Sequence, residues 1–442
     1  MKNLIDTIKN IWRIEELRNR ILITLGLLLV YRIGSFIVLP GVDSARMADG
    51  SSGGGGIVEI LSIFTGGAFT RASIFALGIM PYISASIIMQ LMGIAVPAVQ
   101  KLQKEESGRR KINQWTRYIT IIICVFQAPG YIFTTIDANA APLDDSFWLT
   151  TSVIILTAST LFVMWLGERI TERGLGNGIS LIIMIGILAR FPQAFAQEVV
   201  GRMGPGGGGL VLLLVEVVMW VLIIAGCILL VQGTRRIPVQ FAKRVQGNKQ
   251  YGGVRNYIPL KVNAAGVMPI IFAQAIVLIP MYVAQAFDNP PQWLIGMANS
   301  QGMFYSITLF LMVVIFTYFY TAITVNPNQL ADDMKRNGGF IPGVKPGKQT
   351  ASHIDDLLSR ITLPGAIFLG FVAILPVFAG MAGIKQGFAQ YFGGTSLLIM
   401  VGVLLDTLQQ IESHLLMRHY DGLMKSGRIK GRSGGAAYGM AG

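Results

Sequence analysis

Charged side chains and histidines are scarce in this sequence. Only 13% of the 442 residues are Asp, Glu, Lys or Arg and only three are His, whereas 52% are hydrophobic and the mean hydropathy is +0.57. Soluble domains carry about 25% charged residues, so this composition excludes an ordinary soluble domain. It indicates a chain that crosses a membrane several times.

The residues that catalysis and metal binding require are also missing. The two cysteines, Cys124 and Cys227, fall inside apolar runs, and their spacing suggests neither a disulfide nor a metal site. The histidines His353, His414 and His419 form no metal-ligand pattern, and there is no Gly-x-x-x-x-Gly-Lys-Ser/Thr loop. We therefore expect no enzyme, no cofactor and no metal, and we expect a partner to do any nucleotide-driven work.

Apolar runs of bilayer-spanning length dominate what is present. A helix needs about 20 apolar residues to cross the hydrocarbon core. Ten segments meet this criterion: 21–39, 74–94, 116–136, 149–167, 179–200, 210–232, 264–286, 303–325, 363–381 and 395–415. The preceding 20 residues are too long and too charged for the start of a cleaved signal, so we expect the first span to be retained.

The positive charges predict the orientation of these spans. If the N-terminus is cytoplasmic, 30 of the 36 Lys and Arg residues lie in cytoplasmic segments. This asymmetry follows the positive-inside rule and places both termini in the cytoplasm. Two of the cytoplasmic loops, 233–262 and 326–362, are long and basic.

Two pairs of short motifs indicate an internal repeat. GIMPYI (78–83) in the second span matches GVMPII (266–271) in the seventh, and SLIIMIGI (180–187) in the fifth matches SLLIMVGV (396–403) in the tenth. Spans one to five and six to ten are then two copies of one unit, and they lie upside down relative to each other because five is odd. A functional path is expected between such halves.

The predicted organisation has four parts. A cytoplasmic amphipathic segment (1–20) precedes the N-terminal half (21–205), which is followed by the C-terminal half (206–415) and a cytoplasmic tail (416–442).

Isoleucines occupy equivalent positions of these motifs or lie one helical turn further on. They are Ile83, Ile87, Ile183, Ile187, Ile271 and Ile399. A ring of such side chains would exclude water and ions and still part around a bulky object. Lipid-facing or packing positions are the ordinary alternative for isoleucine in a spanning helix.

Ionisable residues inside the spans are few. Glu216, Asp406 and Arg32 form no evident relay of the kind that ion-coupled transporters carry. An inverted-repeat transporter for a small solute is the second hypothesis, and a scaffold subunit without a pore is the third.

One apolar segment is too short to span the bilayer. Residues 57–69 follow glycines 53–56 and contain Gly66 and Gly67, which can act as hinges. A re-entrant or interfacial helix is one interpretation.

Several longer motifs run through the sequence in order: GIMPYISASIIMQL, ESGRRKINQWTRY (106–118), GERITERGLGNGIS (167–180), RRIPVQFAKR (235–244), PLKVNAAGVMP (259–269), FYTAITVNPNQLADDMKRNGGFIPGVKPGKQT (319–350) and FGGTSLLIMVGV (392–403). These motifs resemble those of the bacterial SecY family, the channel subunit of the Sec protein translocon. The resemblance implies an all-α membrane protein of ten spans in two inverted halves around a pore. The Gly/Ser insert at 50–56, two external loops and the C-terminal tail depart from the family pattern.

The resemblance also implies a plug and a pore ring. The plug would be the short segment at about 57–69, seated in the channel on its outer side, with the apolar residues Ile57, Ile60, Leu61, Ile63, Phe64 and Phe69. The family's constriction maps onto the six isoleucines named above.

A lateral gate is a further implication, formed by the second and seventh spans. Pro81 and Pro269 remove a backbone donor near the start of each gate helix and would weaken its rigidity. Polar groups could bond across the closed seam or to their own helices: Ser84, Ser86, Gln90, Gln127 and Gln274.

The implied activity is passage of unfolded secretory polypeptides across the cytoplasmic membrane and lateral release of transmembrane segments into it. Implied partners are the SecE and SecG subunits, the SecA motor ATPase, the ribosome, signal peptides and nascent chains, a YidC-type insertase and membrane lipids. The motor or ribosome would dock on the basic loops, at Arg235, Arg236, Lys243, Arg244, Arg255, Lys335, Arg336, Lys345, Lys348 and Arg360.

Overall fold

A computed structural model describes most of the chain. The described residues are 12, 14–43, 62, 64–136, 140–142, 145–204, 208–241, 244–246, 249–251, 255–274, 276–277, 291–292, 296–297 and 302–425.

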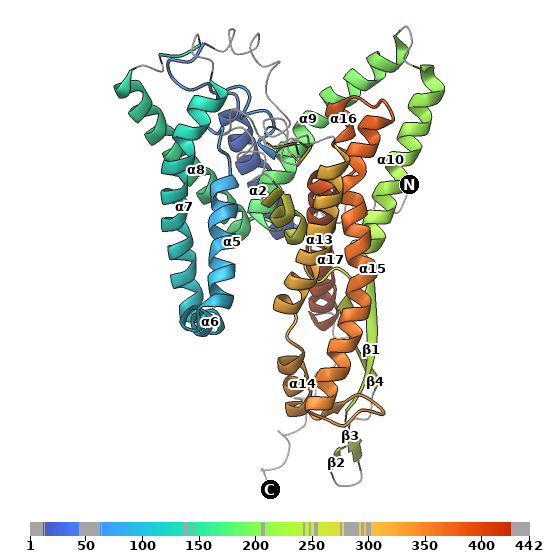
Figure 1. Cartoon of the computed structure of the whole chain (residues 1–442). Helices are drawn as coiled ribbons and strands as arrows, with labels where there is room; N and C mark the ends of the chain where they lie inside the picture. Colours follow the sequence, from blue (N-terminus) through green and yellow to red (C-terminus); the bar gives the residue numbers. More distant parts are fainter. Residues whose placement is uncertain are drawn as a thin grey trace.

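Helices make up most of the described structure. The N-terminal half contains α2 (Glu15–Gly34), α5 (Met80–Ala95), α6 (Pro97–Lys104), α7 (Glu106–Thr135), α8 (Ser146–Arg173) and α9 (Gly178–Met203). The C-terminal half contains α10 (Gly209–Gln232), α13 (Met303–Thr324), α14 (Pro327–Arg336), α15 (Lys348–Met381), α16 (Gln386–Ala389) and α17 (Gly394–Lys425). Helices α5 to α8 form one group, and α9 lies between them and the helices of the C-terminal half (Figure 1).

Seven helices in the described part of the chain are long and apolar enough to cross a membrane. They coincide with the predicted spans three to six and eight to ten. α2 covers most of the predicted first span, and the predicted seventh span is described as far as residue 277, with residue 275 outside the described set. The all-α polytopic architecture predicted from hydropathy is therefore confirmed.

The second span begins later than predicted. Residues 74–79 form turns, and α5 begins only at Met80. Gly78 has φ +54°, in the left-handed region, which an advancing helix does not contain. Pro81 lies in the first turn of α5, where its missing N–H would have no partner within the helix. It therefore begins the helix, and its missing donor does not weaken the helix interior.

The repeated motifs have matching local structures. Gly266 is also left-handed, with φ +65°, and helix likewise begins two residues later, at Met268. In the other pair, Ser180 and Ser396 are each the third residue of their helices, α9 and α17. The sequence repeats thus correspond to repeated backbone geometry, as expected for two copies of one unit.

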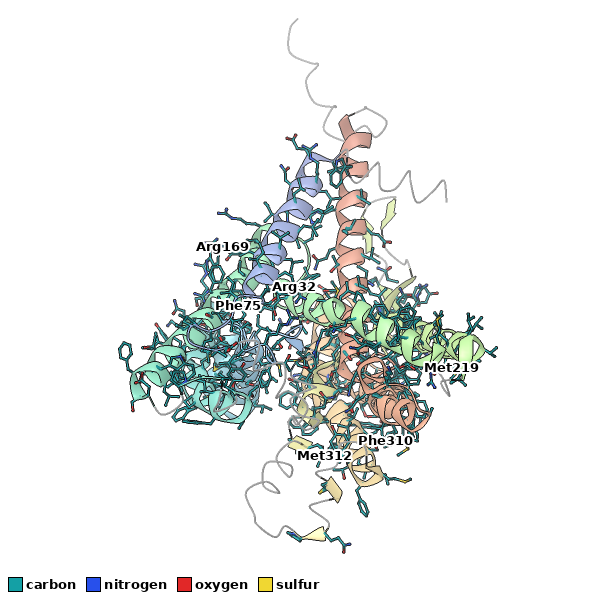
Figure 2. The ribbon with its side chains drawn as sticks, turned by 90° about the horizontal axis from the view of Figure 1, so that it is seen from above. Arg32, Phe75, Arg169, Met219, Phe310 and Met312 are labelled. Carbon is teal, nitrogen blue, oxygen red and sulfur yellow. The ribbon has the colours of Figure 1, made fainter. Side chains whose placement is uncertain are left out.

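α9 packs against both halves. Its Ile182 and Ile187 are fully buried in one apolar cluster with Leu166 of α8 and with Phe388 and Ile399 of the C-terminal half. The side chain of Asn177 fixes the start of this helix by accepting hydrogen bonds from the N–H groups of Ile179 and Ser180. Viewed from above, helices of the two halves gather on opposite sides, with Arg32 near the middle (Figure 2).

The long basic loops, 233–262 and 326–362, carry short strands that the sequence analysis did not predict. Strand β1 (Thr234–Phe241) pairs antiparallel with β4 (Arg255–Lys261) and with β5 (Gly339–Phe340), and β2 (Arg244–Gln246) pairs with β3 (Lys249–Tyr251). An apolar cluster joins this sheet to α14 and α15: Ile237, Val239, Leu260, Met334, Ile341, Ile354 and Leu358. The two basic loops therefore form one packed unit at the end of the C-terminal half (Figure 1).

Candidate functional site

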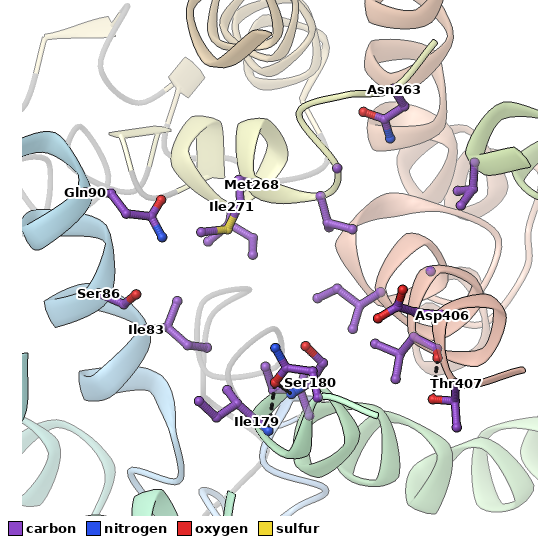
Figure 3. Close-up of a pocket in the computed structure, with 18 of the residues that line it drawn as sticks. Ile83, Ser86, Gln90, Ile179, Ser180, Asn263, Met268, Ile271, Asp406 and Thr407 are labelled. Atoms are coloured by element: carbon purple, nitrogen blue, oxygen red, sulfur yellow. Dashed lines mark hydrogen bonds between the residues drawn. The ribbon is translucent and has the colours of Figure 1, made fainter. Parts of the chain in front are cut away.

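A cavity of about 550 Å³ lies between the two halves. Its walls come from α5, from the start of α9, from segment 261–271 and from α17 (Figure 3). These are the four segments that contain the repeated motifs. The cavity thus lies where the inverted repeat predicts a functional path.

Aliphatic side chains from all four segments line this cavity. Four of the six predicted ring residues are among them: Ile83, Ile183, Ile271 and Ile399. Each comes from a different motif, and each pair of equivalent positions contributes both of its members. The four form an apolar surface shared equally by the two halves.

The other two predicted ring residues lie elsewhere. Ile187 is fully buried in the cluster around α9, where its carbonyl oxygen accepts a 2.9 Å hydrogen bond from the Tyr391 hydroxyl. Ile87 is half-buried and packs against Phe272 and Tyr320 of the C-terminal half. Ile187 thus lies in the packing behind the cavity wall, and Ile87 lies in the contact between α5 and the C-terminal half.

That contact includes a hydrogen bond between the two halves. The phenol of Tyr320 on α13 donates to Oε1 of Gln90 on α5 over 2.7 Å. The ring of Tyr320 lies 5.3 Å from that of Phe272, centroid to centroid, and Phe272 belongs to the seventh span. Gln90, which was predicted as a gate residue, therefore forms a hydrogen bond between α5 and the C-terminal half.

The remaining polar gate candidates make other contacts. Ser84 donates to the carbonyl of Met80 in its own helix, and Gln274 accepts from Thr395 within the C-terminal half. Ser86 lines the cavity. Gln127 is exposed on α7, with no hydrogen bond to the C-terminal half among the described residues. Pro269, like Pro81, lies in the first turn of its helix, which begins at residue 268.

The predicted plug, 57–69, is described only at residues 62 and 64–69. Ile57, Ile60, Leu61 and Ile63 lie outside the described residues. Phe64 packs against the cluster that contains Ile183, Ile187 and Ile399. Phe69 instead stacks edge-on against Tyr131 of α7, with centroids 4.7 Å apart, and its carbonyl accepts a 2.7 Å bond from that phenol. The described end of the segment is thus tied to the N-terminal half.

Glycines allow this segment to approach α9 closely. Gly66 and Gly67 have φ +65° and +86°, conformations that other residues rarely adopt. At Gly186 of α9, a Cβ would overlap the carbonyl oxygen of Phe64 and would lie 3.3 Å from the nitrogen of Gly66. A larger residue at position 186 would push the segment away from the cavity wall.

Three arginines hold the same turn. The guanidinium of Arg32 donates to the Gly66 carbonyl over 3.2 Å, and that of Arg71 donates to it over 3.5 Å. Arg190 of α9 donates to the hydroxyl of Ser62. These are three of the six basic residues that the sequence placed away from the cytoplasm.

Most of the predicted docking residues are displayed on the packed unit that the two basic loops form. Arg235 and Arg236 are exposed on β1, and five others are exposed on or around α14 and α15: Lys335, Arg336, Lys345, Lys348 and Arg360. Arg244 and Arg255 lie on β2 and β4, with side chains outside the described set, and Lys243 is not described. The fold therefore brings the described basic residues of two loops onto one body.

Sequence reasoning missed three residues that the structure brings to the site. Tyr320 is one of four aromatic residues in the run FTYFY (316–320), so nothing marked it as a gate residue. Asn263 and Lys261 line the cavity from a segment noted only for its family motif. Their position just before the repeated motif GVMP (266–269) is the one sequence signal that could have indicated them.

Comparison with known proteins gives a consistent result. A family model described as SecY matches residues 73–408. Relatives named protein translocase subunit SecY are 42% identical in Streptomyces galbus, over 94% of this chain and 98% of that protein, and 42% identical in Vibrio cholerae, over 95% and 96%.

Solved structures share the fold. One described as the structure of a protein-conducting channel is similar at 18% identity with a TM-score of 0.57, over 92% of this chain and 94% of that one. Sec61 in the canine ribosome–channel complex from the endoplasmic reticulum is similar at 16% identity with a TM-score of 0.54, over 92% and 94%.

Proposed function

The chain belongs to the SecY family, and from this premise we propose how its structure conducts polypeptides. It is a protein-conducting channel subunit that passes unfolded polypeptides across a membrane. The names of the relatives favour this function over transport of a small solute. Within the family assignment, the roles of the individual residues below are our proposal.

The observation that carries the mechanism is the shared aliphatic lining of the cavity. Ile83, Ile183, Ile271 and Ile399 come from four segments and two halves. Branched aliphatic side chains at a constriction repel water and ions, yet they can move apart because they form no fixed hydrogen bonds. We assign the seal of the closed channel to these four residues, with Ile187 packed behind it and Ile87 in the adjoining contact between α5 and the C-terminal half.

The lateral gate lies between α5 and the C-terminal half. Ile87 packs on Phe272 and Tyr320, and Gln90 bonds to the phenol of Tyr320. An apolar signal segment that wedges here replaces these contacts with its own. Its preference for the open arrangement drives the change, since a ligand shifts a two-state equilibrium by its differential affinity.

The segment that contains Phe64 and Gly66 is the C-terminal part of the proposed plug. It rests against Gly186 and is held through the Gly66 carbonyl by Arg32 and Arg71. A polypeptide that enters between the halves must displace it, and the left-handed glycines provide the hinge.

The chain supplies no chemistry of its own in this proposal. Force comes from a ribosome or a SecA motor that docks on the exposed basic residues of the packed unit that the two basic loops form, such as Arg235, Arg236 and Arg360. We place both termini in the cytoplasm and the protein in the cytoplasmic membrane, where SecE, SecG and a YidC-type insertase would accompany it. The distribution of Lys and Arg supports this orientation.

Reconstitution tests the proposal. The chain is incorporated into proteoliposomes with SecE and SecG, and SecA, ATP and a radiolabelled secretory precursor are added. Protease-protected precursor that requires ATP and this chain is the expected result. Equal protection in liposomes that lack the chain would contradict the function.

A further inference from the structure

The cavity is lined by polar as well as aliphatic side chains. Asp406 of α17 and Asn263 both line it, and Figure 3 shows them across the cavity from Gln90, Ser86 and Ile83 of α5. Asp406 lies seven residues after Ile399, which is about 10 Å further along the helix. In the proposed orientation this direction leads toward the cytoplasm, so Asp406 lies at the cytoplasmic end of the cavity. Asn263 precedes Ile271 in a span that starts on the cytoplasmic side, so it lies toward the same end.

Asp406 carries the only carboxylate among the described residues that line the cavity. Its side chain is exposed and forms no ion pair with any residue in the described part of the chain. Lys261 lines the same cavity but does not approach the carboxylate within ion-pair distance. Asp406 is thus a negative charge at the entrance of a channel whose chain carries a net charge of +13.

Asn263 provides a second acceptor in the lining of the same cavity. The residue is only 9% exposed, and its Oδ1 has no hydrogen-bond partner in the described structure. A buried carbonyl oxygen without a partner is energetically unfavourable. Such an atom is explained when a donor from outside the chain binds there.

We propose that Asp406 and Asn263 bind the positively charged start of a signal sequence. This inference rests on the proposed function, in which signal sequences enter the cavity. A signal sequence carries basic residues followed by an apolar stretch of 7–15 residues. The cavity offers the same order, with two acceptors at its cytoplasmic end and aliphatic side chains deeper inside.

The physical need for such a site follows from the charge of the molecule. A basic segment that approaches the cytoplasmic face meets exposed arginines and lysines that repel it. A carboxylate inside the entrance offsets that repulsion locally and holds the basic end on the cytoplasmic side. It thereby favours signals that are basic at the start over neutral or acidic ones.

The test compares precursors that differ only in the charge of the signal's first segment. Uptake into proteoliposomes is measured for a basic and a neutral version, and the quantity of interest is the ratio of the two rates. Asp406→Asn is expected to lower this ratio by about two- to fivefold, the range for an exposed ion pair. Asn263→Ala should lower it in the same direction, and high salt should bring the wild-type ratio toward that of Asp406→Asn.

Matched variants separate recognition from folding. Thr407→Val changes the neighbouring cavity residue without removing charge and should leave the ratio unchanged. Asp406→Lys should favour a precursor with an acidic first segment. A ratio that Asp406→Asn leaves unaltered, or equal loss of both precursors, would overturn the inference. Absence of any uptake by the wild-type protein would instead refute the proposed function.

Discussion

Tyr320 of α13 and Gln90 of α5 are joined by a 2.7 Å hydrogen bond that crosses between the two halves of the protein. The donor and the acceptor are 230 residues apart in the sequence. Beside this bond, Ile87 of α5 packs against the apolar cluster of Ala265, Phe272 and Tyr320. This small contact closes the proposed gate, so its strength sets how easily a signal segment opens it.

Tyr320→Phe removes the bond and keeps the ring. A neutral hydrogen bond contributes about 0.5–1.5 kcal/mol, so the open state should become about two- to tenfold more populated. Uptake of a precursor with a weakened signal sequence should rise by a similar factor. Thr395→Val, which removes the bond to Gln274 within one half, is the control and should leave that uptake unchanged.

Ile399→Asn places a polar group in the aliphatic seal. Water enters more readily beside an amide, so the resting channel should leak ions, with a severalfold rise in conductance across planar bilayers. Leu404→Asn on the same helix is the control, because that side chain is exposed and does not line the cavity. Equal conductance of the two variants would argue against the seal.

The double variant Arg32→Gln, Arg71→Gln removes both charged donors from the Gly66 carbonyl. Hydrogen bonds to charged groups contribute about 1.5–3 kcal/mol each, and these two are long, so the lower end of the range applies. Plug displacement should become easier and brief ion-conducting openings more frequent. Arg169→Gln removes an exposed pair with Glu172 and a contact with the Trp165 ring, both away from this segment, and should not change the opening frequency.

A buried ionic cluster joins α9, α10 and the loop before α16. Arg202 bonds to Glu198 over 2.9 Å, to Glu216, and to the carbonyl of Gly383, while the backbone N–H of Lys385 donates to Glu198. Glu198 is only 1% exposed. The cluster therefore fixes the junction at which the N-terminal half passes into the C-terminal half.

Arg202→Met should destabilise this junction by about 3–5 kcal/mol, because it leaves two buried carboxylates without their cation. Thermal unfolding in detergent measures the loss. Adding Glu198→Gln and Glu216→Gln should recover most of the stability, since the uncompensated charge is removed. Arg20→Gln, which breaks an exposed pair with Glu16, should cost less than 1 kcal/mol.

The membrane architecture could be predicted from the sequence because hydropathy and short repeats carry that information directly. The repeat was recognisable from the sequence motifs, and residues that match in it, such as Gly78 and Gly266, also adopt matching backbone conformations. The start of α5 could not be predicted, because nothing in the apolar run 74–79 indicated that a glycine in the left-handed conformation would interrupt it. The sheet in the basic loops was missed because its strands, TRRIPVQF and RNYIPLK, are short and charged.

The candidate site was predictable in part. Equivalent positions identified Ile83, Ile183, Ile271 and Ile399, which line one cavity. Adding one helical turn did not place Ile187 there, because helical spacing fixes a face of α9 but not which neighbour covers that face. Tyr320 could not be recognised, since a hydrogen bond between distant segments leaves no local pattern.

Site-specific crosslinking to an arrested polypeptide tests the central claim most directly. A photoreactive residue replaces Ile183, Ile271 or Ile399 in turn, or the exposed Ile154 of α8 as a control. A precursor is then halted midway through the membrane, and its adducts are analysed. We expect the mid-chain segment of the precursor to crosslink to the three cavity positions and not to position 154. Adducts at position 154 alone, or none at the cavity positions, would contradict a path between the two halves.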